Sequence, residues 1–167
     1  MDLIEQVKSR LIEYDGTDVK RINHALKMHS YARFIAEGEG VADDVRETIE
    51  IAALMHNIGV HVAEEKYGSA AGKYQQLEGA AVAKELLGGL EMDENTRARV
   101  EYLVAHHHAY SDITTLDYQI LVEADFVVNV EEENLDKSAV KNLLVRVFRT
   151  ETGAELLKTL YLDEKNK

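Results

Sequence analysis

The stretch IEIAALMHNIG, residues 49–59, decides the fold. Apart from Glu50, its first seven residues are apolar, which is typical of a helix buried among other helices. It closes on two polar residues, His56 and Asn57, and we expect Gly59 to let the chain turn sharply after them. Burying a polar side chain without a partner costs about 2 kcal/mol or more. The histidine at the end of this helix therefore needs a hydrogen-bond partner or a metal ion.

Apolar residues recur at helical spacing along almost the whole chain, and no strand pattern competes with it. The absence of proline leaves long helices uninterrupted. Residues 59–76 contain several small residues and are expected to form a loop or short helices. Capping and stop signals predict helices at about 3–14, 19–37, 43–56, 77–87, 93–107, 117–131 and 138–149, and a short one near 156–160.

The sequence thus predicts an all-α fold in which residues 1–167 form a single-domain helical bundle. The polar residues that interrupt apolar helix faces fall within a core of about 20–130, and C-terminal helices follow at 137–162. A length of 167 residues with 46% hydrophobic and 30% charged residues suits one domain with a real core.

Composition also limits the possible ligands and partners. The chain has no cysteine, so a metal site must use histidine, carboxylate, amide or water. A net charge of −12 repels nucleic acid and anionic membranes, but it allows a small phosphorylated ligand held by a cation and a few local basic residues. No apolar run is long enough to cross a bilayer, and the N-terminus is unlike a signal peptide, so we expect a cytoplasmic protein.

Two further polar residues lie on apolar faces. His24, in RINHALKMHSYA (21–32), shares its face with Met28, and Asp125, in ILVEADFVVNV (120–130), shares its face with Leu121. Together with His56 they come from three separate helices, which suggests one shared ion. The alternatives are a satisfied core histidine and a left-handed helix cap at Asn57.

Several charged residues and histidines near these motifs are weaker candidates for a site. A salt bridge from Arg21 or Arg99 is the alternative partner for Asp125, and Glu123 is expected to face solvent. In the run 106–108, His107 continues an inward stripe, His106 is placed to reach a site, and His108 lies at the boundary.

The order of these residues resembles the HD superfamily of metal-dependent phosphohydrolases. His24 in R-I-x-H is similar to the first motif of the family, and AALMHNIG (52–59) is similar to its AaLLHDIG. Asp125 in LVEADFVVN matches the last motif, so the resemblance spans about residues 20–130. It implies an HD-type helical bundle in which His24, His56, Asn57 and Asp125 bind a divalent ion, which is Fe, Mn, Co, Ni or Zn.

The resemblance also implies hydrolysis of a nucleotide or another small phosphoester. His106 and His107 are then expected to act in catalysis, by binding phosphate or protonating the leaving oxygen. Val60 stands where many relatives have a lysine, so Lys66 and Lys73 are candidates for the phosphate contacts, with solvated loop lysines as the alternative. No feature of the sequence defines the oligomeric state.

One residue departs from the family pattern, because Asn57 stands where the family has an aspartate. An amide oxygen can still coordinate a cation, but it brings no charge and cannot take a proton. Two alternatives to a hydrolase therefore stay open. One is a catalytically impaired module that binds metal or phosphate, and the other is a metal-free helical interaction protein.

Overall fold

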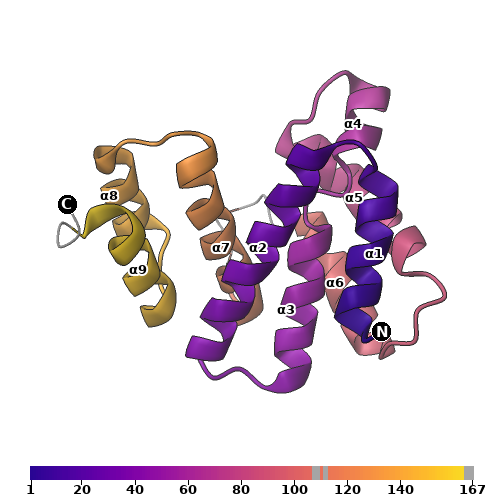
Figure 1. The fold of residues 1–167 in the computed structure, drawn as a ribbon, viewed down its shortest axis with the longest axis horizontal. Coiled ribbons are helices and arrows are strands. Elements are labelled where there is room, and N and C mark those ends of the chain that lie inside the picture. Colours follow the sequence, from indigo (N-terminus) through magenta and orange to yellow (C-terminus); the bar gives the residue numbers. More distant parts are fainter. Residues whose placement is uncertain (107–109, 111–112, 164–167) are drawn as a thin grey trace.

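The computed structural model describes residues 1–106, 110 and 113–163. This part of the chain contains helices and no strand, which confirms the all-α prediction (Figure 1). The helices are α1 (Leu3–Asp15), α2 (Val19–Gly38), α3 (Asp43–Met55), α4 (Val60–Tyr67), α5 (Gly72–Leu87), α6 (Glu94–His106), α7 (Leu116–Glu132), α8 (Lys137–Arg146) and α9 (Glu151–Leu157), followed by a π-helical turn (Lys158–Leu162). No helix in the described residues is long and apolar enough to cross a membrane.

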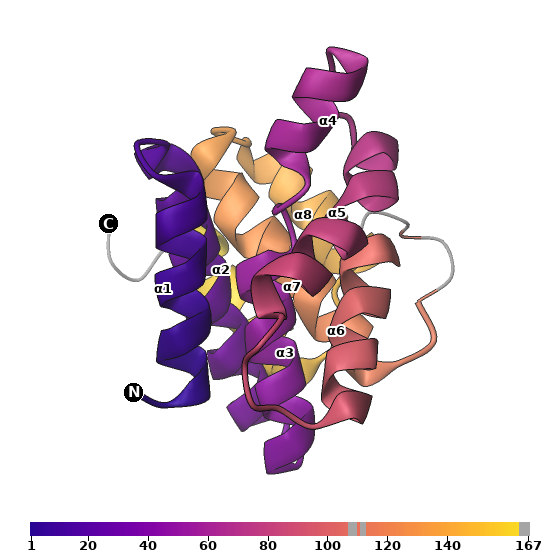
Figure 2. The same cartoon turned by 90° about the vertical axis from the view of Figure 1, so that its right-hand side faces the viewer.

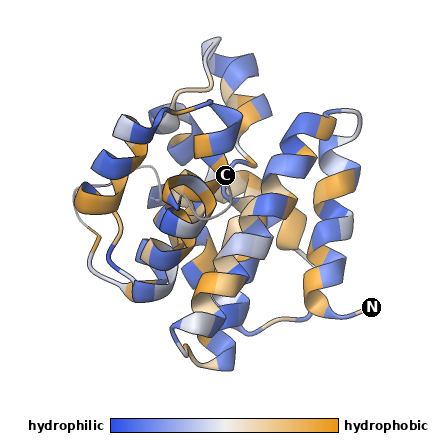
Figure 3. Cartoon of the chain, turned by 60° about the vertical axis from the view of Figure 1, so that its left-hand side comes forward, coloured by the Kyte–Doolittle hydropathy of each residue, from blue (hydrophilic) through white to orange (hydrophobic). Residues whose placement is uncertain are grey.

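Helix α3 is the central element of the bundle. It packs against α1, α2, α6 and α7, and every residue from Thr48 to Met55 is buried (Figures 1 and 2). The surrounding helices are amphipathic, and apolar and polar segments alternate along them (Figure 3). The charged residue inside this stretch, Glu50, is paired with His29 of α2 at 2.9 Å. This pair is a buried contact between α2 and α3. Burial lowers the pKa of His29, although the neighbouring Glu50 opposes that shift.

The C-terminal helices cover the other side of α7. Figure 1 shows α8 and α9 beside α7, away from α1, and their apolar faces form a smaller cluster with it. The buried members of this cluster are Val127, Val130, Val140, Phe148 and Leu157. Helix α7 therefore contributes to two apolar layers, which explains why most of its residues are buried.

Glu123 of α7 is buried, so the expectation that it faces solvent is wrong. Its side chain is 0% exposed and accepts hydrogen bonds from Gln119 Nε2 and from the backbone N–H groups of Arg149 and Thr150. It also accepts a bond of 2.6 Å from the Thr150 hydroxyl. Thr150 is the N-cap of α9, so the carboxylate fixes the start of that helix to α7.

Three helix boundaries differ from the sequence prediction by three or more residues. Helix α5 begins at Gly72, five residues before the predicted start at Leu77, α9 begins at Glu151 instead of Leu156, and α8 ends at Arg146 instead of Arg149. The first turns of α5 (GKYQ, 72–75) and α9 (ETGA, 151–154) contain few apolar residues, so apolar periodicity does not mark where these helices begin. For α9 the cap is Thr150, whose side chain accepts a bond from Gly153 N.

Gly59 is required by close packing, not by its conformation. Its φ of −80° is accessible to any residue, which corrects the expected role in a sharp turn. A Cβ at this position would lie 2.8 Å from Gly79 N and 2.9 Å from Gln75 O, both backbone atoms of α5. The turn that carries His56 and Asn57 therefore lies directly on the backbone of α5.

We predict that Glu123→Ala lowers the free energy of unfolding by about 3 kcal/mol, because it leaves four buried donors without their acceptor. Chemical denaturation measures this loss. Glu131→Ala is the matched control, since Glu131 is an exposed residue of the same helix and should cost far less. Equal losses in the two variants would show that Glu123 does not hold α9.

Candidate metal centre

Three side chains from three helices meet at one buried point. His24 lies on α2, His56 follows the last residue of α3, and Asp125 lies in the middle of α7. The two imidazole Nε2 atoms are 3.0 Å apart, and each lies 3.5 Å from Asp125 Oδ1. All three residues are buried. The tight packing of α3 against α2 and α7 brings these distant positions together.

These distances fit the ligands of a single ion. Two donor atoms that each lie about 2.1 Å from a metal are separated by about 3.0 Å at a right angle and about 3.4 Å at a tetrahedral angle. The observed separations of 3.0 and 3.5 Å agree with that range. Two imidazoles and a carboxylate suit a first-row transition metal.

The second nitrogen of each ring supports the same conclusion. His56 Nδ1 lies 2.7 Å from the carbonyl oxygen of Ala53, which can only accept, so Nδ1 carries the proton. His24 Nδ1 lies 2.7 Å from Glu132 Oε2, so it donates to that carboxylate. If both rings are neutral, each Nε2 carries a lone pair. These two lone pairs then point toward each other and toward Asp125 Oδ1. A metal ion between these three electron-rich atoms would remove their mutual repulsion, and the outer bonds orient the rings for it.

The surrounding charges favour a positive charge at this point. Burial lowers the pKa of His24, but the carboxylates of Asp125 and Glu132 outweigh it and leave the pKa above its ordinary value. Burial raises the pKa of Glu132, yet its bonds to His24 and Lys27 hold that pKa below the ordinary value. Glu132 therefore stays ionised and polarises the ring of His24.

Asn57 lies on the wall of the cavity beside these ligands. The alternative that it is a left-handed helix cap is wrong, because its φ is not positive. Its backbone carbonyl accepts a bond from Val60 N at the start of α4. The side chain is half-buried and faces the same cavity as His24 and Asp125.

The cavity has a volume of about 360 Å³, which suits a small ligand. Its described lining residues are Lys20, Arg21, His24, Asn57, Gln75, Tyr110, Asp125, Asn129, Glu132 and Glu133. Two cations come from the first turn of α2, and two carboxylates come from the end of α7. The helix dipoles have the same signs as these charges, so the cavity has a positive side and a negative side.

Lys20 and Arg21 are cavity residues that the sequence analysis did not assign to the site. The sequence does indicate that Arg21 lies near the site, because Arg21 stands three residues before His24 and so shares its face of the helix. The predicted phosphate ligands lie elsewhere. Lys66 is exposed and pairs with Glu78 at 3.1 Å, and Lys73 is exposed over the ring of Tyr74; neither is among the described lining residues.

The histidine run is only partly described. His106 is exposed at the end of α6, where its ring stacks on Tyr102 and its Nδ1 lies 2.7 Å from the Tyr102 carbonyl oxygen. It is not among the described residues that line the cavity. His107 and His108 lie outside the described residues. The catalytic roles of His106 and His107 stay predictions.

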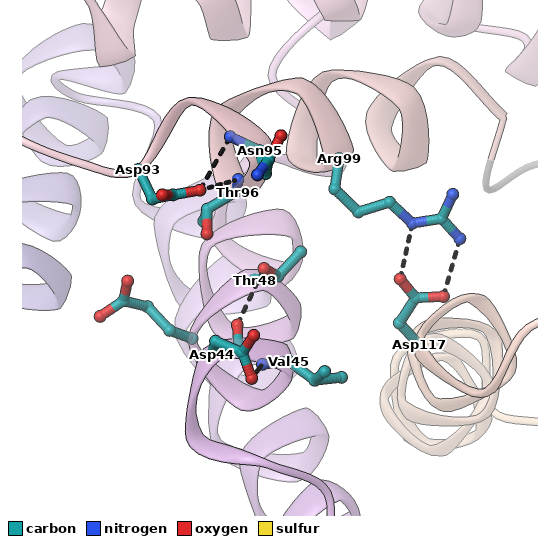
Figure 4. Close-up of a pocket in the computed structure, with 9 residues that line it drawn as sticks. Asp44, Val45, Thr48, Asp93, Asn95, Thr96, Arg99 and Asp117 are labelled. Carbon is teal, nitrogen blue, oxygen red and sulfur yellow. Dashed lines mark hydrogen bonds and ion pairs between the residues drawn. The ribbon is translucent and has the colours of Figure 1, made fainter.

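A larger cavity, of about 490 Å³, lies at the other end of α3 and α7 (Figure 4). Arg99 makes two bonds there to Asp117, at 2.7 and 2.9 Å, as Figure 4 shows. Arg99 is thus committed to Asp117, and the alternative salt bridge from Arg99 to Asp125 is wrong. Asp117 and Asp125 lie on the same helix, eight residues apart, so the two cavities are separated by about 12 Å along it.

The all-α bundle and its buried histidine–aspartate cluster define the class of protein. The HD domain family model matches residues 21–147, which is most of the chain, and the chain belongs to this family. No curated protein and no solved structure matches the sequence significantly.

We predict that Asp125→Asn weakens Mn(II) binding at least about tenfold, because it removes the only charged ligand of the described cluster. Titration calorimetry measures the affinity. Asp117→Asn is the matched control, since it removes a carboxylate from the same helix away from the cluster. The metal assignment is contradicted if both variants bind Mn(II) as the native protein does.

Proposed function

We propose that the protein is a metal-dependent phosphohydrolase that acts on a nucleotide or another small phosphoester. The observation that carries this proposal is the approach of two imidazole nitrogens and the Asp125 carboxylate, beside a cavity whose lining residues include Lys20 and Arg21. The HD domain family, to which the chain belongs, consists largely of hydrolases and supports the same proposal.

His24, His56 and Asp125 would hold the ion, with Asn57 as a further neutral oxygen ligand. The candidates are Fe(II), Mn(II), Co(II), Ni(II) and Zn(II), because nitrogen and oxygen ligands do not discriminate among them. When bound, such an ion polarises a phosphoryl oxygen and makes a neighbouring water more acidic. The bonds from the Nδ1 atoms to Ala53 and Glu132 keep the rings oriented for this role.

The remaining side chains of the cavity would bind and orient the phosphoester. Lys20 and Arg21 carry the positive charge for the phosphate oxygens. Tyr110 as a residue is 45% exposed, but desolvation of its hydroxyl, with a contribution from Asp125, raises its pKa to about 12. Its hydroxyl therefore stays protonated at neutral pH and can donate a hydrogen bond to an anionic oxygen.

Proton transfer would have to avoid Asn57, whose amide cannot accept a proton. The carboxylates on the cavity wall are Asp125, Glu132 and Glu133. Glu132 is a weak base because its pKa is lowered by His24 and Lys27 against the effect of burial. Glu133 is exposed at the end of α7 and is the remaining candidate for the proton acceptor.

Asn57 also supports a second candidate function, a module that binds a phosphorylated ligand without hydrolysing it. Replacing a carboxylate by an amide removes one negative charge from the ligand set and one potential base. Binding by Lys20 and Arg21 does not depend on that base.

Asn57→Asp separates these two functions. The added charge should raise the Mn(II) affinity roughly tenfold, because affinity follows the charge of the ligands. A panel of nucleotides and small phosphoesters is then assayed for phosphate release with both proteins. We expect the native protein to hydrolyse at least one compound. If only Asn57→Asp releases phosphate, the native protein is the binding module.

Removing the positive charges of Lys20 and Arg21 tests whether these side chains bind the phosphate. Lys20→Met and Arg21→Met should each weaken binding of inorganic phosphate to the Mn(II)-loaded protein, by about five- to tenfold. Lys66→Met and Lys73→Met are the matched controls on the α4–α5 segment. If the controls weaken binding and the α2 variants do not, the original assignment to Lys66 and Lys73 is correct.

A further inference from the structure

The side-chain amide of Gln75 uses its nitrogen in a hydrogen bond, but its oxygen has no partner among the described residues. Gln75 lies in the first turn of α5 and lines the same cavity as His24 and Asp125. Its Nε2 donates to the carbonyl oxygen of Ala70 at 2.7 Å. Its Oε1 is buried and has no hydrogen-bond partner among the described residues. Buried acceptors without a donor are rare in folded proteins, so this oxygen needs an explanation.

The orientation of the amide is fixed by its neighbour. A 180° rotation of the amide would place Oε1 against the carbonyl oxygen of Ala70, and two acceptors repel each other. Oε1 therefore points away from Ala70. The backbone of Gln75 is also held in place, because its carbonyl oxygen lies against Gly59, where a Cβ would come within 2.9 Å. Gln75 thus presents a fixed, unused acceptor.

A comparison within the molecule shows that this atom is unusual. The other buried side-chain atom without a hydrogen bond in the described residues is Arg46 Nε. That nitrogen lies 3.6 Å from Glu50 Oε2, so an opposite charge stabilises it. Gln75 Oε1 is instead a neutral atom to which no described residue donates a hydrogen bond, and Gln75 is one of the residues that line the cavity to which the phosphoester is assigned.

We propose that Gln75 Oε1 accepts a hydrogen bond from a hydroxyl group of the organic part of the phosphoester, and so selects hydroxyl-bearing substrates. This inference rests on the proposed function. The cations of the cavity, Lys20 and Arg21, suit the phosphate, whereas a neutral acceptor suits a neutral donor. Because Oε1 is shielded from bulk water, this bond competes little with solvent. A ligand without the hydroxyl leaves the acceptor unpaired, which is the basis of strong discrimination.

Binding of a matched pair of compounds tests this inference. Glycerol phosphate and propyl phosphate share a three-carbon chain and differ in their hydroxyl groups. Calorimetry with the Mn(II)-loaded native protein should give about tenfold tighter binding of glycerol phosphate. Gln75→Leu should reduce this ratio to about one, mainly by weakening glycerol phosphate. Gln75→Glu retains an acceptor and should keep a preference for glycerol phosphate.

Gln76→Leu is the matched control, because it removes an amide from the next residue of α5, which is not among the described lining residues. It should leave the ratio unchanged. The inference is overturned if the native protein does not distinguish the two compounds, if it binds neither, or if Gln75→Leu keeps the full ratio. These measurements need no turnover, so a protein that discriminates without releasing phosphate would contradict the proposed hydrolysis and not the role of Gln75.

Discussion

The approach of two imidazole nitrogens to 3.0 Å is the contact on which the site depends. It requires that α2 and α3 pack closely at one level, and that α7 delivers Asp125 to the same level. The outer nitrogens bond to Ala53 and Glu132, so the rings cannot turn their lone pairs away from each other without losing these bonds. Facing lone pairs repel each other, and a proton or a metal ion between them removes that repulsion. The geometry of the candidate site therefore depends on the packing of three helices.

The helical architecture and the three buried side chains of the candidate site could be predicted from sequence because both follow from local patterns. Helical periodicity places His24 and Asp125 on apolar faces, and a polar residue there needs a partner whatever the fold. The HD resemblance supplied the pairing of these residues, and the family match confirms the resemblance. Periodicity alone gives no distance between helices, so the separation of the ligands had to come from the structure.

The remaining parts of the site depend on tertiary contacts that leave little local signal. Lys20 lies in a first helical turn that looks solvated in the sequence, and only the position of α7 makes it part of a cavity. Lys66 looked suitable because it lies in a loop-like segment, but that segment forms α4 and the side chain pairs with Glu78. The burial of Glu123 likewise depends on Thr150, which is 27 residues away along the chain.

The contact between Gly59 and Gly79 has a consequence for how a ligand enters the cavity. Backbone atoms meet there without any side chain that can rotate. The turn carrying His56 and Asn57 and the first half of α5 therefore form one inflexible wall. The exposed residues of the cavity lining include Lys20 and Glu133, which come from other helices and carry opposite charges. A ligand that enters past them meets an electrostatic as well as a steric constraint.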